Sequence, residues 1–166
     1  MSTNLRIILH GHAQRFATEE LLRQFGASFE PGESSAAAKE ADKQLAATTG
    51  IVIEATLAEL PATYELHSVC SPEATSDVET SVRRLDQANE PRVYTRNGAT
   101  ADLPRNHEIK RQLWQALSDI TKKHFPWGSL TGVHPTHVVQ KLLQTNDEAA
   151  TLQRLTLAYG VSPSKA

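Results

Sequence analysis

The stretch "LRIILHGHAQ", residues 5–14, contains the first regular element of the chain. Its apolar and β-branched part, "LRIIL" (5–9), lies between polar residues and Gly11, a pattern typical of a short buried strand. Two histidines, His10 and His12, stand where this strand ends. The stretch therefore predicts a strand, and it raises the question of whether the two imidazoles bind a metal ion.

Outward from this strand, helical and strand-like patterns follow one another up to residue 95. Glutamates near the start and Gly26 at the end favour a helix over 17–27. The full set of predicted elements is a helix over 17–27, a loop over 28–36 and an alanine-rich helix to residue 47, strands over 51–58 and 62–69 joined as a hairpin, a helix over 72–89 and a strand over 92–95.

The predicted helix over 72–89 determines the fold class. Its apolar residues recur at helical spacing, namely Ala74, Val78, Val82 and Leu85. The order strand, helix, strand, strand, helix, strand is that of a ferredoxin-like βαββαβ sandwich. Other α+β arrangements remain open at this point.

Beyond residue 98 every pattern is helical. We expect helices over 105–124, from Pro135 onward, and from the capping sequence "TNDE" (145–148) to Gly160. The sequence thus predicts an α+β ferredoxin-like domain over 1–97, followed by a C-terminal three-helix region over 98–166.

Composition excludes several classes of protein. No apolar run approaches the 18 residues of a membrane-spanning helix, and no secretory signal is visible, so a cytoplasmic protein without a membrane partner is expected. Cys70 is the only cysteine, which excludes an internal disulfide and a cysteine-rich zinc module. Neither a glycine-rich phosphate loop nor a Gly-x-Ser-x-Gly nucleophile motif occurs.

The net charge of −2 hides an uneven distribution. Residues 103–166 hold eight Lys or Arg against four Asp or Glu, and aromatic residues are interleaved with cations over 83–127. Cations that follow phosphates, beside rings that stack on unpaired bases, suit single-stranded nucleic acid. The predicted contact residues are Arg92, Arg96, Arg105, Lys110, Arg111, Trp114, Lys122, Lys123 and Trp127.

The favoured function is therefore non-catalytic binding of single-stranded DNA or RNA as an accessory protein. The segment "QLWQALSDI" (112–120) resembles a short piece of the NinB-type recombination mediators of phages, which bind single strands. The alternative for Trp114 and Trp127 is a place in the core. The alternative function is a protein-interaction or assembly module with a protein partner or a second copy of the chain.

A second alternative is a small metal-dependent hydrolase or nuclease. On a strand, His10 and His12 lie on the same side and can hold one divalent metal, the only cofactor that the sequence suggests. The pair resembles the His-x-His motif of single-strand nucleases that use a tyrosine nucleophile, with Gly11 where that motif has a bulky apolar residue. The other reading makes both histidines ordinary surface residues at a strand end, and His12→Ala harmless for stability.

Overall fold

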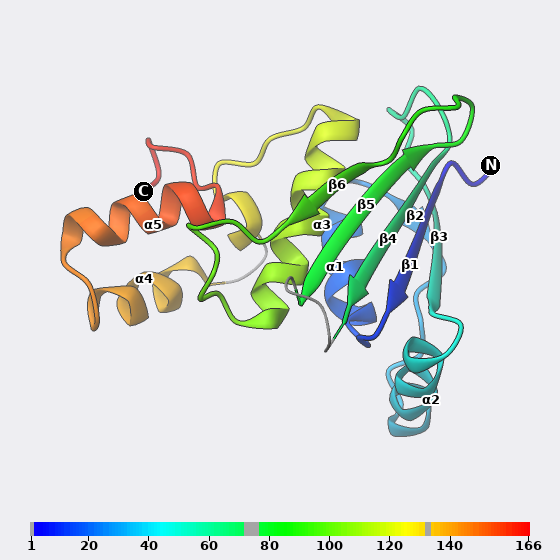
Figure 1. The fold of residues 1–166 in the computed structure, drawn as a ribbon, viewed down its shortest axis with the longest axis horizontal. Helices are drawn as coiled ribbons and strands as arrows, with labels where there is room; N and C mark the ends of the chain where they lie inside the picture. Colours follow the sequence, from blue (N-terminus) through cyan, green and yellow to red (C-terminus); the bar gives the residue numbers. More distant parts are fainter. Residues whose placement is uncertain (1, 72–76, 132–133) are drawn as a thin grey trace.

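The structure is a computed structural model that describes residues 2–71, 77–131 and 134–166 (Figure 1). The fold is mixed α+β, and its described part contains one six-stranded sheet and five helices. The strands are β1 (Leu5–His10), β2 (Ser28–Phe29), β3 (Ile51–Thr56), β4 (Tyr64–Cys70), β5 (Val78–Arg84) and β6 (Arg92–Thr95). The helices are α1 (Arg15–Gln24), α2 (Ala36–Ala47), α3 (Arg105–Thr121), α4 (Pro135–Leu143) and α5 (Glu148–Tyr159), with a 3-10 turn η1 (Gly128–Leu130) before α4.

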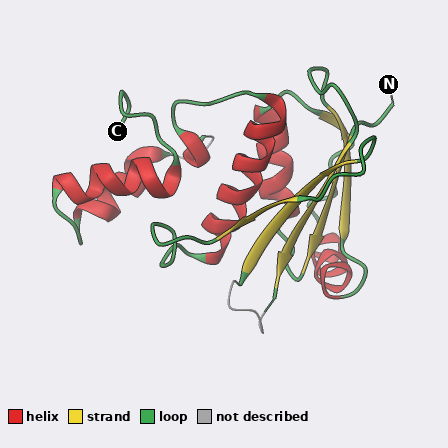
Figure 2. Cartoon of the chain, turned by 45° about the horizontal axis from the view of Figure 1, so that its top comes forward, coloured by secondary structure: helices red, strands yellow, loops and turns green. Residues whose placement is uncertain are grey.

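The sheet has helices against one face only. Its strand order is β2-β3-β1-β4-β5-β6, in which β1 is parallel to β4 and every other neighbouring pair is antiparallel. Figure 2 shows α1 and α3 on one side of the strands. Leu5, Ile7 and Leu9 face these helices and are fully buried. No helix of residues 2–71, 77–131 or 134–166 lies across the opposite face (Figures 1 and 2).

The predicted hairpin between residues 51–58 and 62–69 is wrong, because β1 lies between β3 and β4. The connection from β3 to β4 passes the start of β1, where Asn4 fastens it. The Asn4 side chain donates to the carbonyl of Leu57 and accepts from its N–H, at 2.7 and 2.9 Å, and the Tyr64 N–H donates to the Asn4 carbonyl at 2.9 Å. The ladders of β1 with β3 and β4 thus replace the expected hairpin pairing, and Asn4 ties the connection to the start of β1.

The predicted helix over 72–89 is also wrong where the structure describes it, since residues 78–84 form β5. Val78 and Val82 are buried, as the helical stripe requires, but so is Thr80 between them, and Leu85 is 50% exposed. Positions four apart share a face in a strand as well as in a helix. Residues 72–76, with the predicted start of the helix, lie outside the described residues.

Because a strand replaces the second helix, the ferredoxin-like βαββαβ order is not clearly present. One hydrophobic core nevertheless joins the sheet to the helices on its covered face. Phe25 of α1 and Leu113 and Leu117 of α3 belong to the same cluster as the strand residues. The helix α3 follows the domain boundary predicted at residue 97, but it packs with the sheet that precedes this boundary.

The C-terminal helices form close to their predicted positions, but the predicted Thr-x-x-Glu cap at Thr145 is wrong, because Asp147 is the N-cap of α5. The carboxylate of Asp147 accepts from the Ala150 N–H and caps α5, which ends at Gly160 in the left-handed conformation. A second cluster, which includes Leu130, Leu155 and Tyr159, holds η1 and α5 together. Figure 1 shows α4 and α5 at the left, to one side of the sheet. In the described residues no helix is long and apolar enough to cross a membrane.

Candidate functional site

The predicted nucleic-acid contacts near the start of α3 are engaged within the chain. The guanidinium of Arg96 binds the Asp77 carboxylate through two nitrogens and donates to the carbonyls of Thr100 and Leu103 at 2.9 and 2.8 Å. Arg105 reaches the same carboxylate at 3.4 Å. These contacts hold the pKa of the Asp77 carboxyl below its usual range. Arg96 thus fastens the loop before α3 to the start of β5.

Two predicted cations of α3 point into the protein. Arg111 is 7% exposed and binds Glu108, which is fully buried, through two nitrogens at 2.7 and 3.0 Å. The ammonium of Lys110 donates to the carbonyl of Thr131 at 3.0 Å, and burial lowers the pKa of this lysine. Both side chains have structural partners that a phosphate would have to displace.

The remaining predicted cations are more accessible. Lys123 pairs with Glu59 at 2.8 Å, and Arg92, whose side chain is 63% exposed, contacts Asp119 at 3.3 Å. Lys122 is exposed and occupies the left-handed position that ends α3. Lys122 is therefore the member of the predicted set that is best placed to meet an external anion.

The two tryptophans are half-buried against different clusters. Trp114 packs on the core of the sheet, and Trp127 packs on the C-terminal cluster. The buried indole N–H of Trp114 has no hydrogen-bond acceptor among the described residues. The structure thus packs both predicted rings against the protein and pairs most of the predicted cations, and the nucleic-acid interface stays a prediction.

The histidines of the opening stretch have different neighbours. The ring of His10 stacks on that of His67, with centroids 5.6 Å apart and planes within 5°. His12 is 8% exposed and its Nε2 lies 3.0 Å from the Ser68 hydroxyl. The expectation that His12 is a surface residue is therefore wrong. No group of three potential metal ligands comes together in the described ranges.

Burial of His12 predicts acid destabilisation. Burial lowers the pKa of His12 from 6.5 to about 4, so the folded protein keeps this imidazole neutral while the unfolded chain protonates it. The free energy of unfolding is therefore highest above pH 6.5, and it falls by at most about 3 kcal/mol as the pH falls from 6.5 to 4. We expect urea unfolding across this range to show the loss, and His12→Gln to reduce it. His124→Gln, at an exposed histidine, is the control, and equal pH slopes for all three proteins would contradict the assignment.

The side of the sheet that no helix of the described residues covers is here called the open face (Figures 1 and 2). Its residues are Arg6, Ile8 and His10 of β1, Val52 and Glu54 of β3, Glu65, His67 and Val69 of β4, Glu79, Ser81 and Arg83 of β5, and Val93 and Thr95 of β6. Strand register aligns five of them in a middle row, which runs Val52, Ile8, His67, Ser81, Val93. The terminal valines are 38% and 49% exposed.

A second row of the open face consists of charges of alternating sign. It runs Glu54, Arg6, Glu65, Arg83 from β3 to β5. Arg6 lies 4.0 and 3.6 Å from the two glutamates that flank it. With Glu79, carboxylates outnumber guanidinium groups on this face, so it does not suit a phosphate backbone. Sequence reasoning missed these residues, although Glu65 and His67 are polar residues at alternate positions of the predicted strand over 62–69.

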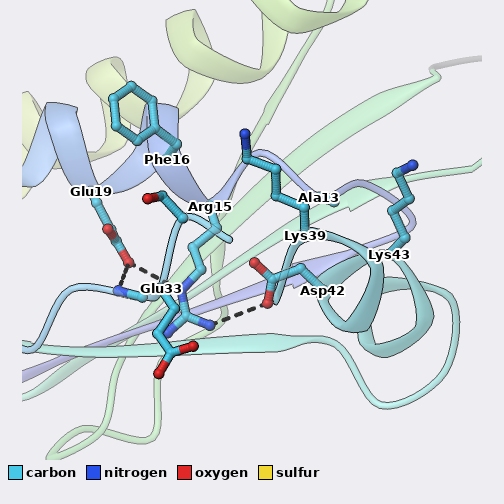
Figure 3. A pocket seen from close by; sticks show the side chains of 10 residues that line it. Ala13, Arg15, Phe16, Glu19, Glu33, Lys39, Asp42 and Lys43 are labelled. Atoms are coloured by element: carbon cyan, nitrogen blue, oxygen red, sulfur yellow. Dashed lines mark hydrogen bonds and ion pairs between the residues drawn. The ribbon is translucent and has the colours of Figure 1, made fainter. Parts of the chain in front are cut away.

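A cavity of about 420 Å³ lies between α1 and α2 (Figure 3). Arg15 crosses it and binds Glu19 at 3.0 Å and Asp42 at 3.3 Å. Figure 3 shows Lys39 and Lys43 extending from α2, and Phe16 is 72% exposed beside them. Carboxylates and cations are equal in number along its lining. The cavity therefore has no evident preference for a charged ligand.

Comparisons with protein-family models, curated proteins and solved structures find no match to this chain. The functional argument consequently depends on the geometry of the described residues.

Proposed function

We propose that this chain is an assembly module that pairs with a second copy of itself through the open face. The observation that supports this proposal is the charged row Glu54, Arg6, Glu65, Arg83. Its signs alternate over four positions, so the row read from one end is the complement of the row read from the other. A surface with this property is self-complementary, as a two-fold dimer interface has to be.

The register defines the arrangement of the two sheets. A two-fold axis parallel to the strands, between β1 and β4, places β1 of one copy over β4 of the other. Arg6 then faces Glu65 of the second copy, and Glu54 faces Arg83. In the middle row Ile8 comes over His67. Two sheets aligned in this way pack about 10 Å apart with strands roughly 30° from parallel.

The size of the open face predicts a reversible dimer. Five strands about 4.8 Å apart and six residues of about 3.3 Å each span roughly 20 by 20 Å. At about 400 Å² for each partner, such a face is smaller than the roughly 800 Å² per partner of a standard specific interface and has the size of a weak, transient one. We therefore expect a monomer–dimer equilibrium with a dissociation constant in the micromolar range.

The experiment is a charge-exchange test by sedimentation equilibrium. Arg6→Glu and Glu65→Arg each place like charges opposite one another in a homodimer, so each variant alone is expected to be monomeric. In an equimolar mixture the glutamate introduced at position 6 faces the arginine introduced at position 65, and the two unchanged side chains, Glu65 and Arg6, face each other. The mixture is therefore expected to dimerise, and recovery by mixing shows that both variants are folded.

The matched control changes charges outside the open face. Lys39→Glu and Glu40→Arg alter exposed positions of α2 and should leave the wild-type equilibrium unchanged. A wild-type protein that stays monomeric up to its solubility limit, or two variants that do not dimerise on mixing while the wild type does, would contradict the proposal.

A further inference from the structure

We infer that the groove between α3, α4 and α5 binds a small amphipathic carboxylate, an apolar molecule with one negative charge. The groove has a volume of about 440 Å³ and adjoins a recess of about 60 Å³, and both are lined by His107, Val138 and Tyr159. The combined space is within the range of small-molecule sites. Its residues lie outside the open face, so the inference does not depend on the proposed dimer.

Apolar side chains form much of the wall. Loop residues before α3, two residues one turn apart on α4, and the ring of a buried tyrosine contribute: Leu103, Pro104, Val138, Leu142 and Tyr159. Val138 and Leu142 are only half-buried, and α4 has no fully buried residue. These carbons remain accessible along the groove, and an apolar ligand body would remove them from water.

The charge of the groove is positive. Lys141 is exposed on α4 and has no ion pair among the residues that the structure describes, and Lys110 lies at the adjoining recess. Burial lowers the pKa of His107, and the ammonium groups of these two lysines lower it further. Among the described residues that line the groove, Asp102 is the only one with a carboxylate, and it is paired with Arg154. An anion entering the groove would therefore meet the unpaired charge of Lys141, while Lys110 also interacts with Glu20 and the Thr131 carbonyl.

The donors suit a carboxylate better than a phosphate. Lysines can bind phosphate as point charges, but bidentate guanidinium groups and converging backbone N–H groups give phosphate sites their geometric specificity. Here the guanidinium of Arg154 is occupied by Asp102. The ammonium groups of Lys141 in the groove and Lys110 at the recess both interact with His107, and together with the apolar wall they match one carboxylate on a hydrocarbon body.

The test uses octanoate and octanol as probes, followed by chemical shifts in two-dimensional ¹H–¹⁵N NMR of the full chain. Octanoate is expected to shift amide signals around the groove in a saturable way. Lys141→Gln should lower the affinity for octanoate by about tenfold, the effect of losing one charge-assisted hydrogen bond. Octanol should bind both proteins equally, because the substitution removes only charge.

Lys110→Gln is the second variant, checked by a thermal melt because Lys110 is half-buried, and Lys39→Gln on α2 is the matched control. Lys39→Gln should leave octanoate binding unchanged. The inference is overturned if octanoate causes no saturable shifts at millimolar concentration. It is equally overturned if folded Lys141→Gln and Lys110→Gln both bind octanoate as tightly as the wild type.

Discussion

Arg111→Met is expected to cost about 3–5 kcal/mol of the free energy of unfolding, a typical effect of breaking a buried ion pair. The substitution leaves the carboxylate of Glu108 fully buried, and among the described residues its remaining side-chain donor is Gln112, at 2.6 Å. It also removes the hydrogen bond, 3.0 Å long, from the Arg111 guanidinium to the carbonyl of Thr95. Urea unfolding at pH 7 measures the loss.

The control is Arg92→Met, which removes an exposed guanidinium from its contact with Asp119. Exposed pairs contribute between 0 and about 1 kcal/mol, so this variant should unfold close to the wild type. Glu108→Leu combined with Arg111→Met should be more stable than Arg111→Met alone, because no unpaired charge remains. A single Arg111→Met that unfolds like Arg92→Met would show that the ion pair is not buried.

The same ion pair affects how the nucleic-acid hypothesis can be tested. Reversing the charge of Arg111 places a second carboxylate beside Glu108. If such a variant lost oligonucleotide binding, the cause would be unfolding and not the loss of a phosphate contact. Lys122 is exposed and ends α3, and a change at this position leaves the core intact. An oligonucleotide titration with Lys122→Glu therefore examines the surface without disturbing the fold.

Local signals in the sequence predict the elements whose ends are defined by local chemistry. Pro135 starts α4, Gly160 ends α5, and Gly26 adopts the left-handed conformation after α1. Each of these signals depends on the backbone of the residue itself, so it needs no knowledge of distant contacts. The α+β class and the helical C-terminal region follow from them.

The sequence could not predict features that depend on strand order. The i, i+4 spacing of Val78 and Val82 fits a helix and a strand equally. Burial of Thr80 between them indicates the strand, but this burial depends on what covers the residue and is not visible in the sequence. The position of β1 between β3 and β4 depends on its ladders with two strands far along the chain, beside which Asn4 pairs with Leu57. The charged row of the open face exists only in this strand order, so no local motif reveals it.

Gly11→Ala is expected to be among the most destabilising single substitutions in the chain. Gly11 has a φ of +71°, which alanine adopts at a cost of about 1–3 kcal/mol. Its added Cβ would also stand 2.1 Å from the carbonyl oxygen of Cys70, a backbone atom at the end of β4 that cannot rotate away. Overpacking adds roughly 1–3 kcal/mol to this cost. The two effects together should lower the melting temperature by roughly 10 °C.

Gly98→Ala is the matched control for this substitution. A Cβ at Gly98 meets no atom of the described residues within 4 Å, and its φ is not in the left-handed range. Both substitutions restrict the unfolded chain equally, which by itself stabilises a protein by about 0.4–1 kcal/mol. The difference between the two melting temperatures thus isolates the folded-state strain at Gly11. If the two variants melt within about 2 °C of each other, the turn between His10 and His12 does not pass under the end of β4, and the parallel pairing of β1 with β4 would have to be revised at that end.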